Sequence, residues 1–271
     1  MTKLDSNAAW KEASSKISAN RDVFLALAGV FFVVPSLALT VIGGEPEVVP
    51  GMQGEAMMAA ITAFYAEAWW LILASAVLQV VGVLAILTLM RDRTRPTVGE
   101  AIRSALSGLL PYLGAQLLFA LAFGLVGGVA IGVGAAVAPP LAAVMTILLV
   151  IAAVFAGVRL ILVAPAIAVE GTRNPLAAMQ RSWKLTKGQF WRILGFLALV
   201  MILFFVVLGV IMLLVGVVLA IFTSGETQRV LAAVVSSVLT AIVVTYVIGI
   251  IAAIHRQLAG PDPAGLAETF V

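Results

Sequence analysis

The chain has 271 residues, of which 63% are hydrophobic and 11% are charged, and its formal net charge is +3. A soluble domain carries roughly 25% charged and 45–50% apolar residues, so lipid must solvate much of this chain. It contains no cysteine, which excludes disulfides, thiolate catalysis and cysteine metal sites. It has one histidine, His255, which argues against a zinc or haem site, and we expect no cofactor.

Six apolar runs are long enough to cross the hydrocarbon core, which requires about 20 helical residues. Pro139-Pro140 divides the longest charge-free stretch, because proline disrupts a helix interior. The polar N-terminus does not resemble a cleavable signal peptide, so we expect the first span to remain. The expected spans are 24–43, 68–90, 112–137, 141–163, 193–222 and 230–254. The sequence predicts an all-α integral membrane protein with six transmembrane helices.

The expected membrane domain covers 24–258, between an amphipathic N-terminal segment at 1–23 and a tail at 259–271. Nearly all Lys and Arg residues lie in the N-terminal segment, the second-to-third and fourth-to-fifth connections, and the tail. The first-to-second connection carries glutamates and neither Lys nor Arg. Because basic residues favour the cytoplasmic side, we expect both ends of the chain in the cytoplasm.

Short amphipathic cytoplasmic helices are expected before the odd-numbered spans. Thr97 and Glu100 form a capping-box pattern at the start of the second one. The apolar positions with helical spacing are Trp10, Ala13 and Ile17; Val98, Ile102, Ala105 and Leu109; and Leu176, Met179 and Trp183. Either the chain contains three copies of a unit, a surface helix followed by a membrane hairpin, or similar basic loops precede each hairpin without a repeat.

Small and polar residues within the spans suggest how the helices pack. Gly124, Gly128 and Gly132 recur every four residues, which predicts close approach of a neighbouring helix on that face. Pro35 predicts a kink in the first span. Gln116 lies at membrane depth, where we expect its amide to hydrogen-bond between helices.

The stretch 173–192 combines five basic residues with three aromatic ones. An amphipathic helix of this kind lies in the headgroup layer, and each cation near an anionic surface contributes about 1 kcal/mol. The candidate lipid-contact residues are Arg181, Trp183, Lys184, Lys187 and Trp191. A topology anchor without ligand specificity would use the same residues, so both interpretations remain open.

Arg159 is the one charged residue within an expected span, near the cytoplasmic end of the fourth. An ionisable residue inside the membrane is a functional candidate by default. A structural role is the alternative: Arg159 reaches the interface with its long side chain, or it pairs with Glu170 once Pro165 turns the chain back. Arg159 and Glu170 are the candidate intramembrane polar residues.

A sparse pattern of residues runs through the second half of the chain. It comprises Arg159-Leu160, Pro165, Glu170, Pro175, Ala178, Arg181-Ser182-Trp183, Leu185-Thr186, Gly188 and Phe190-Trp191, with further matches at Arg95-Pro96-Thr97, Glu100-Ala101 and Arg256-Gln257-Leu258. This pattern resembles the membrane domain of bacterial glycerophosphoryl diester phosphodiesterases and of related stand-alone membrane proteins. The resemblance implies a multipass module in the bacterial cytoplasmic (inner) membrane. In the fused enzymes a separate barrel domain hydrolyses substrate with a carboxylate and histidine metal cluster, so that activity is not carried over to this sequence.

We therefore expect a non-enzymatic membrane protein that contacts anionic phospholipid or a partner at the cytoplasmic face. The candidates for catalysis, Glu170, His255, Asp92 and Glu100, are scattered in the sequence. The alternatives are a small-molecule or lipid transporter, and an accessory subunit of a membrane-lipid enzyme. Nucleic-acid binding is not expected, because the basic residues lie within reach of the bilayer. A protein partner or a second copy of the chain is left open.

Overall fold

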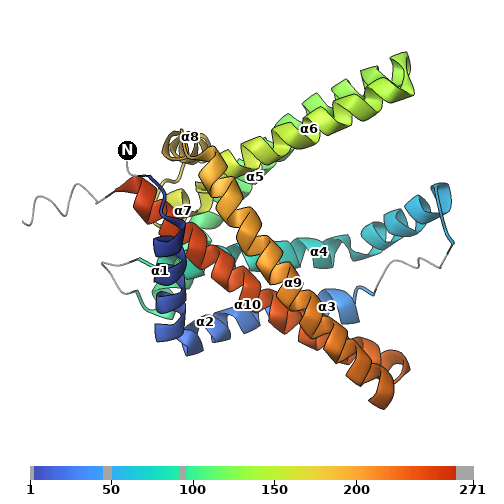
Figure 1. The fold of residues 1–271 in the computed structure, drawn as a ribbon, viewed down its shortest axis with the longest axis horizontal. Helices are drawn as coiled ribbons and strands as arrows, with labels where there is room; N and C mark the ends of the chain where they lie inside the picture. Colours follow the sequence, from blue (N-terminus) through green and yellow to red (C-terminus); the bar gives the residue numbers. More distant parts are fainter. Residues whose placement is uncertain (1–2, 45–50, 92–95, 261–271) are drawn as a thin grey trace, which may run out of the picture.

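The structure is a computed structural model that describes residues 3–44, 51–91 and 96–260. Every regular element in these ranges is a helix, which confirms the predicted all-α fold (Figure 1). In chain order the elements are α1 (Ser6–Ala19), α2 (Arg21–Ala28), the π-helical η1 (Gly29–Val33), α3 (Val34–Val41), α4 (Glu55–Leu89), α5 (Val98–Val137), α6 (Pro139–Leu160), α7 (Val163–Ala168), α8 (Pro175–Leu185), α9 (Phe190–Phe222) and α10 (Gly225–Ala259).

Six helical stretches in the described residues are long and apolar enough to cross a membrane. They are Arg21–Val41, Glu55–Leu89, Val98–Val137, Pro139–Ala168, Phe190–Phe222 and Gly225–Ala259. Each overlaps one expected span but extends beyond it, because helical hydrogen bonding continues into flanks that are less apolar. The 35 residues of α4 measure about 52 Å, against about 30 Å of hydrocarbon, so part of this helix lies outside the core.

Proline positions shape two of these stretches. The α5 helix ends at Val137 and α6 begins at Pro139, which confirms the predicted division. In the first stretch, η1 directly precedes α3, whose first turn contains Pro35. This π-helical turn interrupts the regular α-helical hydrogen bonding shortly before Pro35.

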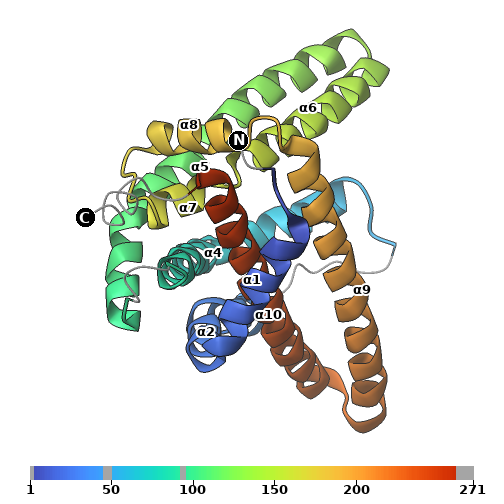
Figure 2. The same cartoon turned by 60° about the vertical axis from the view of Figure 1, so that its left-hand side comes forward.

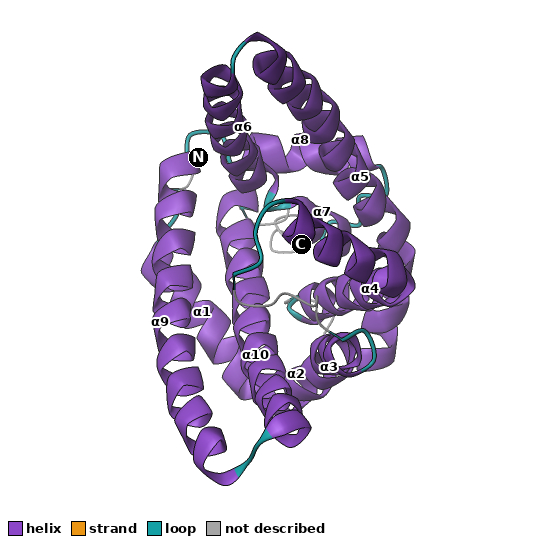
Figure 3. Ribbon diagram, turned by 90° about the vertical axis from the view of Figure 1, so that its right-hand side faces the viewer, coloured by secondary structure: helices purple, strands orange, loops and turns teal. Residues whose placement is uncertain are grey.

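The helices converge at one end of the molecule, here called the hub, which comprises α1, α2, α7, α8 and the adjoining ends of α4, α5 and α10 (Figures 1 and 2). The whole of α7 is buried in the hub, against α4, α5, α8 and α10. Away from the hub, the α5–α6 and α9–α10 hairpins diverge, and their tips lie at opposite ends of the view in Figure 3. The diverging parts expose apolar side chains, as helices solvated by lipid would.

The two ends of the described chain meet at the hub. The backbone N–H of Asp5 donates to Gln257 Oε1 at 2.9 Å, and Gln257 Nε2 donates back to the Asp5 carbonyl at 3.1 Å. Glu12 of α1 also forms an ion pair with Arg256 of α10. Both ends therefore lie on one side, as an even number of membrane crossings requires.

The face of α5 that packs on α6 differs from the one predicted. A Cβ at Gly124, Gly128 or Gly132 would meet nothing within 4 Å, so the prediction of close approach there is wrong. The close contacts are at Gly127, opposite Leu149, and at Gly134, where a Cβ would lie 3.1 Å from the Ala142 Cα. A four-residue spacing identifies a helix face, but not the rotation that turns one face toward the neighbouring helix.

Of the three predicted surface helices, one is continuous with its membrane span and two are separate elements. The capping box is confirmed: the Glu100 N–H donates to Thr97 Oγ1 at 3.3 Å, and the Thr97 N–H donates to Glu100 Oε2 at 2.8 Å. The helix that begins there continues through Pro111 into the third span, so it is not a separate element. By contrast, α1 and α8 end before their spans begin, so the second unit differs from the first and third.

Candidate functional site

The site begins where α8 is fastened to the end of α6. Ser182, which is fully buried, donates from Oγ to the Arg159 carbonyl at 2.8 Å and accepts from the Leu162 N–H at 3.1 Å. Thr186, one turn later and also buried, reaches the same carbonyl at 3.2 Å. The last carbonyls of a helix lack partners within it, so these two hydroxyls cap α6 and fix α8 beside it.

This fastening places Arg159 against Trp183. The Arg159 Cζ lies 4.6 Å from the centre of the Trp183 ring, a cation–π contact. Phe155, one turn before Arg159, meets Trp183 edge-on at 5.8 Å and Phe190 at 4.9 Å. Arg159 itself is only 7% exposed. The predicted pairing of Arg159 with Glu170 is wrong, because α8 brings a different arginine to that carboxylate.

Glu170, in the connection between α7 and α8, binds Arg181 and His255. Arg181 donates from Nε to Glu170 Oε2 at 2.9 Å and from Nη2 to Oε1 at 3.0 Å, and His255 Nε2 lies 3.0 Å from Oε1. Burial acts to raise the pKa of Glu170, but the hydrogen bonds from His255 and Arg181 outweigh it and lower that pKa to about 2. Glu170 is therefore a carboxylate at neutral pH, and it joins α8 to α10.

The remaining predicted lipid-contact residues are all exposed, and they are here called the α8–α9 surface: Trp183, Lys184, Lys187 and Trp191. Trp183 is 40% exposed and Trp191 78% exposed. A turn with Gly188 at a φ of +77° separates the two helices and carries Lys187. No described residue forms an ion pair with either lysine, whereas Arg181 is held by Glu170. The structure thus separates Arg181 from the four residues with which the sequence grouped it.

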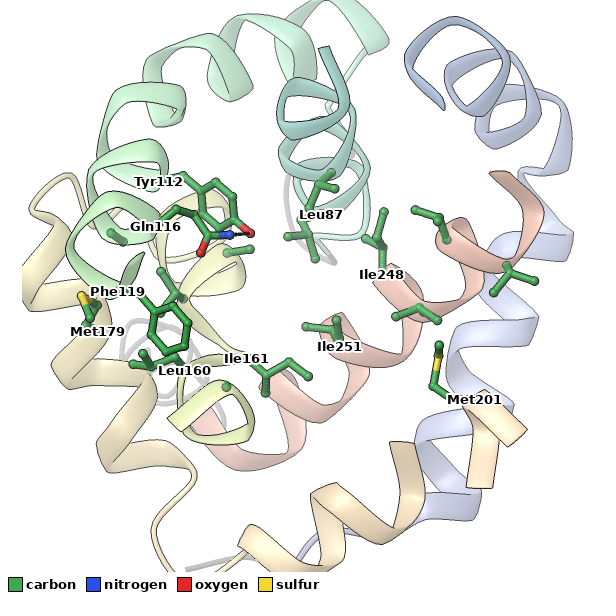
Figure 4. A pocket seen from close by; sticks show the side chains of 18 residues that line it. Leu87, Tyr112, Gln116, Phe119, Leu160, Ile161, Met179, Met201, Ile248 and Ile251 are labelled. Carbon is green, nitrogen blue, oxygen red and sulfur yellow. Dashed lines mark hydrogen bonds between the residues drawn. The ribbon is translucent and has the colours of Figure 1, made fainter. Parts of the chain in front are cut away.

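An apolar cavity of about 460 Å³ lies among the spans, close to the hub (Figure 4). Its walls include Leu87 of α4, Phe119 of α5, Leu160 of α6 and Ile248 of α10, and no charged residue lines it. One polar pair faces it: Gln116 Nε2 donates to the Tyr112 hydroxyl at 3.0 Å. Both residues belong to α5, so the predicted hydrogen bond of Gln116 between helices is wrong.

A second cavity, of about 580 Å³, opens between α1, α2, the end of α4 and the start of α5. Lys16, Asn20, Arg91 and Thr97 supply its polar wall. Lys16 Nζ donates to the Met90 carbonyl at 3.3 Å, and an Arg91 Nη2–H donates to the Ala168 carbonyl. Burial lowers the pKa of Arg91, and the nearby charge of Arg173 lowers it further. This wall is cationic, because it contains Lys16 and Arg91.

Two of the four scattered candidates for catalysis come together. Glu170 and His255 meet, but neither lines the apolar cavity. Glu100 caps α5, and Asp92 lies outside the described residues. Among the residues that the structure describes, no group of three His, Asp or Glu side chains is placed to hold a metal ion. The sequence analysis did not predict the roles of Ser182 and Thr186. Both residues belong to the family-like pattern, but that pattern does not indicate that their hydroxyls cap α6.

Six apolar helical stretches, joined at a buried hub, define an α-helical multipass membrane protein. Residues 138–259 match the family model described as the membrane domain of glycerophosphoryl diester phosphodiesterase. The matched part runs from the start of α6 to the end of α10 and contains Arg159, Glu170, Arg181, Ser182 and His255. The family resemblance is therefore confirmed over this part of the chain. Comparison with curated proteins and with solved structures found no match.

Proposed function

We propose that this protein is a non-enzymatic membrane module that binds anionic phospholipid through the α8–α9 surface, on the cytoplasmic side of a bacterial inner membrane. The observation that carries the proposal is that Lys184 and Lys187 are exposed, without an ion-pair partner among the described residues, beside the exposed rings of Trp183 and Trp191. Cations next to tryptophans suit the level of the lipid headgroups.

The position of this surface along the chain supports the proposal. The α9 stretch begins at Phe190, three residues after Lys187, which supports assigning the two lysines to the membrane boundary. Two cations at an anionic surface contribute about 2 kcal/mol in total, at roughly 1 kcal/mol each. That is enough to enrich anionic lipid locally by more than tenfold, since each 1.4 kcal/mol is a factor of ten. The positive-inside rule supports assigning the hub to the cytoplasmic side.

The non-enzymatic part of the proposal is supported by the structural tasks of the polar groups. Glu170, His255 and Arg181 hold one another, and Ser182 and Thr186 cap α6. A general acid, base or nucleophile must instead reach the reacting atoms of a substrate. The hydrogen bonds of these five side chains are instead those expected of groups that hold helices together.

The test is native mass spectrometry of the protein extracted with its lipids, comparing the parent with a Lys184→Gln/Lys187→Gln variant. Arg181 stays in place because its loss would remove one of the two partners of Glu170. The matched control is Lys11→Gln/Arg103→Gln, which removes two exposed charges from α1 and α5 at the hub. We expect the parent and control to retain anionic phospholipid that the α8–α9 variant loses. Equal retention by all three proteins would overturn the proposal.

A second candidate function is lipid translocation, which the apolar cavity among the spans favours. Gly157 lines this cavity, and a Cβ there would meet nothing within 4 Å, so Gly157→Leu adds bulk inside it. Fluorescent phospholipid in proteoliposomes, bleached from outside by dithionite, reports translocation. Faster bleaching with the parent than with Gly157→Leu would support this function. Rates equal to those of protein-free liposomes would exclude it.

A further inference from the structure

The Arg159 guanidinium is a buried cation without an anionic partner among the described residues. Its side chain lies within a membrane-spanning stretch, and the residue is 7% exposed. Its Nε is buried and has no hydrogen-bond acceptor. Its contact is the face of Trp183, which offers no acceptor oxygen to the five N–H donors of a guanidinium.

Two acceptors close to Arg159 in the sequence are already engaged. Glu170 receives its hydrogen bonds from Arg181 and His255. The Arg159 carbonyl accepts from Ser182 and Thr186. A buried charge without a partner costs several kcal/mol, so such groups are almost always paired in proteins. Because no described residue pairs with Arg159, the site has room for an anion supplied by the surroundings of the helices.

The setting of Arg159 indicates which anion this is. The neighbouring rings of Phe155 and Trp183 are each about 40% exposed, on the outer surface of the helices, where the solvent is lipid. Arg159 is one residue from the end of α6, at the hub end, so it lies near the boundary where phosphates are found. A guanidinium presents a planar fork that binds two oxygens of a phosphate at once.

We infer that Arg159 binds the phosphate of a phospholipid headgroup, with Trp183 holding the guanidinium in position. The inference rests on the proposed function and deepens it. The exposed Lys184 and Lys187 provide the attractive field at the surface, and Arg159 makes the phosphate contact one layer deeper. The positive charges of the two lysines attract any anionic lipid, whereas the buried Arg159 guanidinium requires the phosphate group itself.

The test uses the full chain, stripped of lipid in a neutral detergent. Binding is followed by native mass spectrometry and by the shift of the melting temperature. Four probes are titrated separately: phosphatidylglycerol, diacylglycerol as a phosphate-free lipid, glycerol 3-phosphate and inorganic phosphate. The variants are Arg159→Met, which keeps the bulk, Arg159→Lys, which keeps the charge without the fork, and Lys184→Gln/Lys187→Gln.

We expect the parent to bind phosphatidylglycerol and be stabilised by it, and not to bind diacylglycerol. Arg159→Met should bind phosphatidylglycerol at least tenfold more weakly, and Arg159→Lys should fall between the two. Without lipid, Arg159→Met should melt no lower than the parent, because it replaces an unpaired buried charge by an apolar side chain. If it does not fold, the comparison between Arg159→Lys and the parent decides the matter, and an unchanged affinity in Arg159→Lys would overturn the inference.

Other outcomes separate this inference from the proposed function. Suppose that the parent and Arg159→Met bind phosphatidylglycerol equally, while Lys184→Gln/Lys187→Gln binds it more weakly. This result would overturn the role of Arg159 and leave the surface proposal standing. Glycerol 3-phosphate or inorganic phosphate binding as tightly as the lipid, and depending on Arg159, would show a soluble anion to be the ligand and would overturn the lipid assignment. A parent that binds no phosphatidylglycerol would overturn both proposals.

Discussion

His255 Nε2 and Glu170 Oε1 lie 3.0 Å apart, although 85 residues separate them in the chain. The contact connects the hub end of α10 to the connection that precedes α8, and Arg181 completes it from α8 itself. Because Ser182 and Thr186 fasten the other face of α8 to α6, this short helix is held from two sides. The surface that carries Lys184 and Trp183 is therefore presented by a rigid element.

Removal of the Glu170 carboxylate should destabilise the hub. Glu170→Ala leaves the buried His255 ring and the Arg181 guanidinium without their acceptor, which we expect to cost about 2–3 kcal/mol. Thermal unfolding in detergent, followed by circular dichroism, measures the loss. Glu226→Ala is the control, because that carboxylate is exposed and pairs with Arg229 one turn away. Equal melting temperatures for the two variants would contradict a structural role for the cluster.

Stability should fall as acid protonates Glu170. Its pKa is lowered in the fold from 4.5 to about 2, so the carboxylate stabilises the folded state above about pH 4.5. That contribution, roughly 2–3 kcal/mol, should be lost progressively between pH 4.5 and 2. Glu170→Gln cannot titrate at this position. The difference in melting temperature between the parent and Glu170→Gln should therefore shrink over this window, and a difference independent of pH would refute the assignment.

The Ser182 hydroxyl should contribute to stability through its two hydrogen bonds. Ser182→Ala leaves the buried Leu162 N–H without its acceptor, while Thr186 still reaches the Arg159 carbonyl. We expect a loss of about 1–3 kcal/mol, the usual cost of one unsatisfied buried polar group. Ser104→Ala is the comparison, since Ser104 follows Arg103 at the start of α5 as Ser182 follows Arg181 in α8, and Ser104 is partly exposed. A full threefold repeat would predict similar losses at both positions, whereas the structure predicts a loss at Ser182.

Two glycines should respond in opposite ways to an added methyl group. At Gly82 of α4, a Cβ would lie 2.5 Å from the Phe31 Cβ, which cannot move without shifting the backbone of η1. Gly82→Ala should cost about 1–3 kcal/mol through overpacking. At Gly128 the space is open, so Gly128→Ala should be nearly neutral. Melting temperatures in detergent distinguish the two, and strong destabilisation by Gly128→Ala would instead indicate that this face of α5 packs on a second copy.

Much of the architecture could be predicted because it depends on local properties of the chain. The six apolar runs, the division at Pro139-Pro140, the irregularity near Pro35 and the Thr97–Glu100 capping box each arise within a few neighbouring residues. The residue pattern between Arg159 and Trp191 also indicated the family that matches residues 138–259. The ends of the helices were predicted less well from local sequence, because helical hydrogen bonding continues into segments of lower hydropathy.

The sequence by itself thus determined that the chain has six stretches long and apolar enough to cross a membrane, where its helices break, and which segment gathers cations and tryptophans. Only the tertiary structure decided the partners: Glu170 with Arg181 and His255 instead of Arg159, and Gly127 and Gly134 instead of Gly128 as the contact face of α5. The physical reason is that composition and spacing act along one helix. The rotation of each helix about its axis, and hence each side-chain contact, depends on distant residues packed around it.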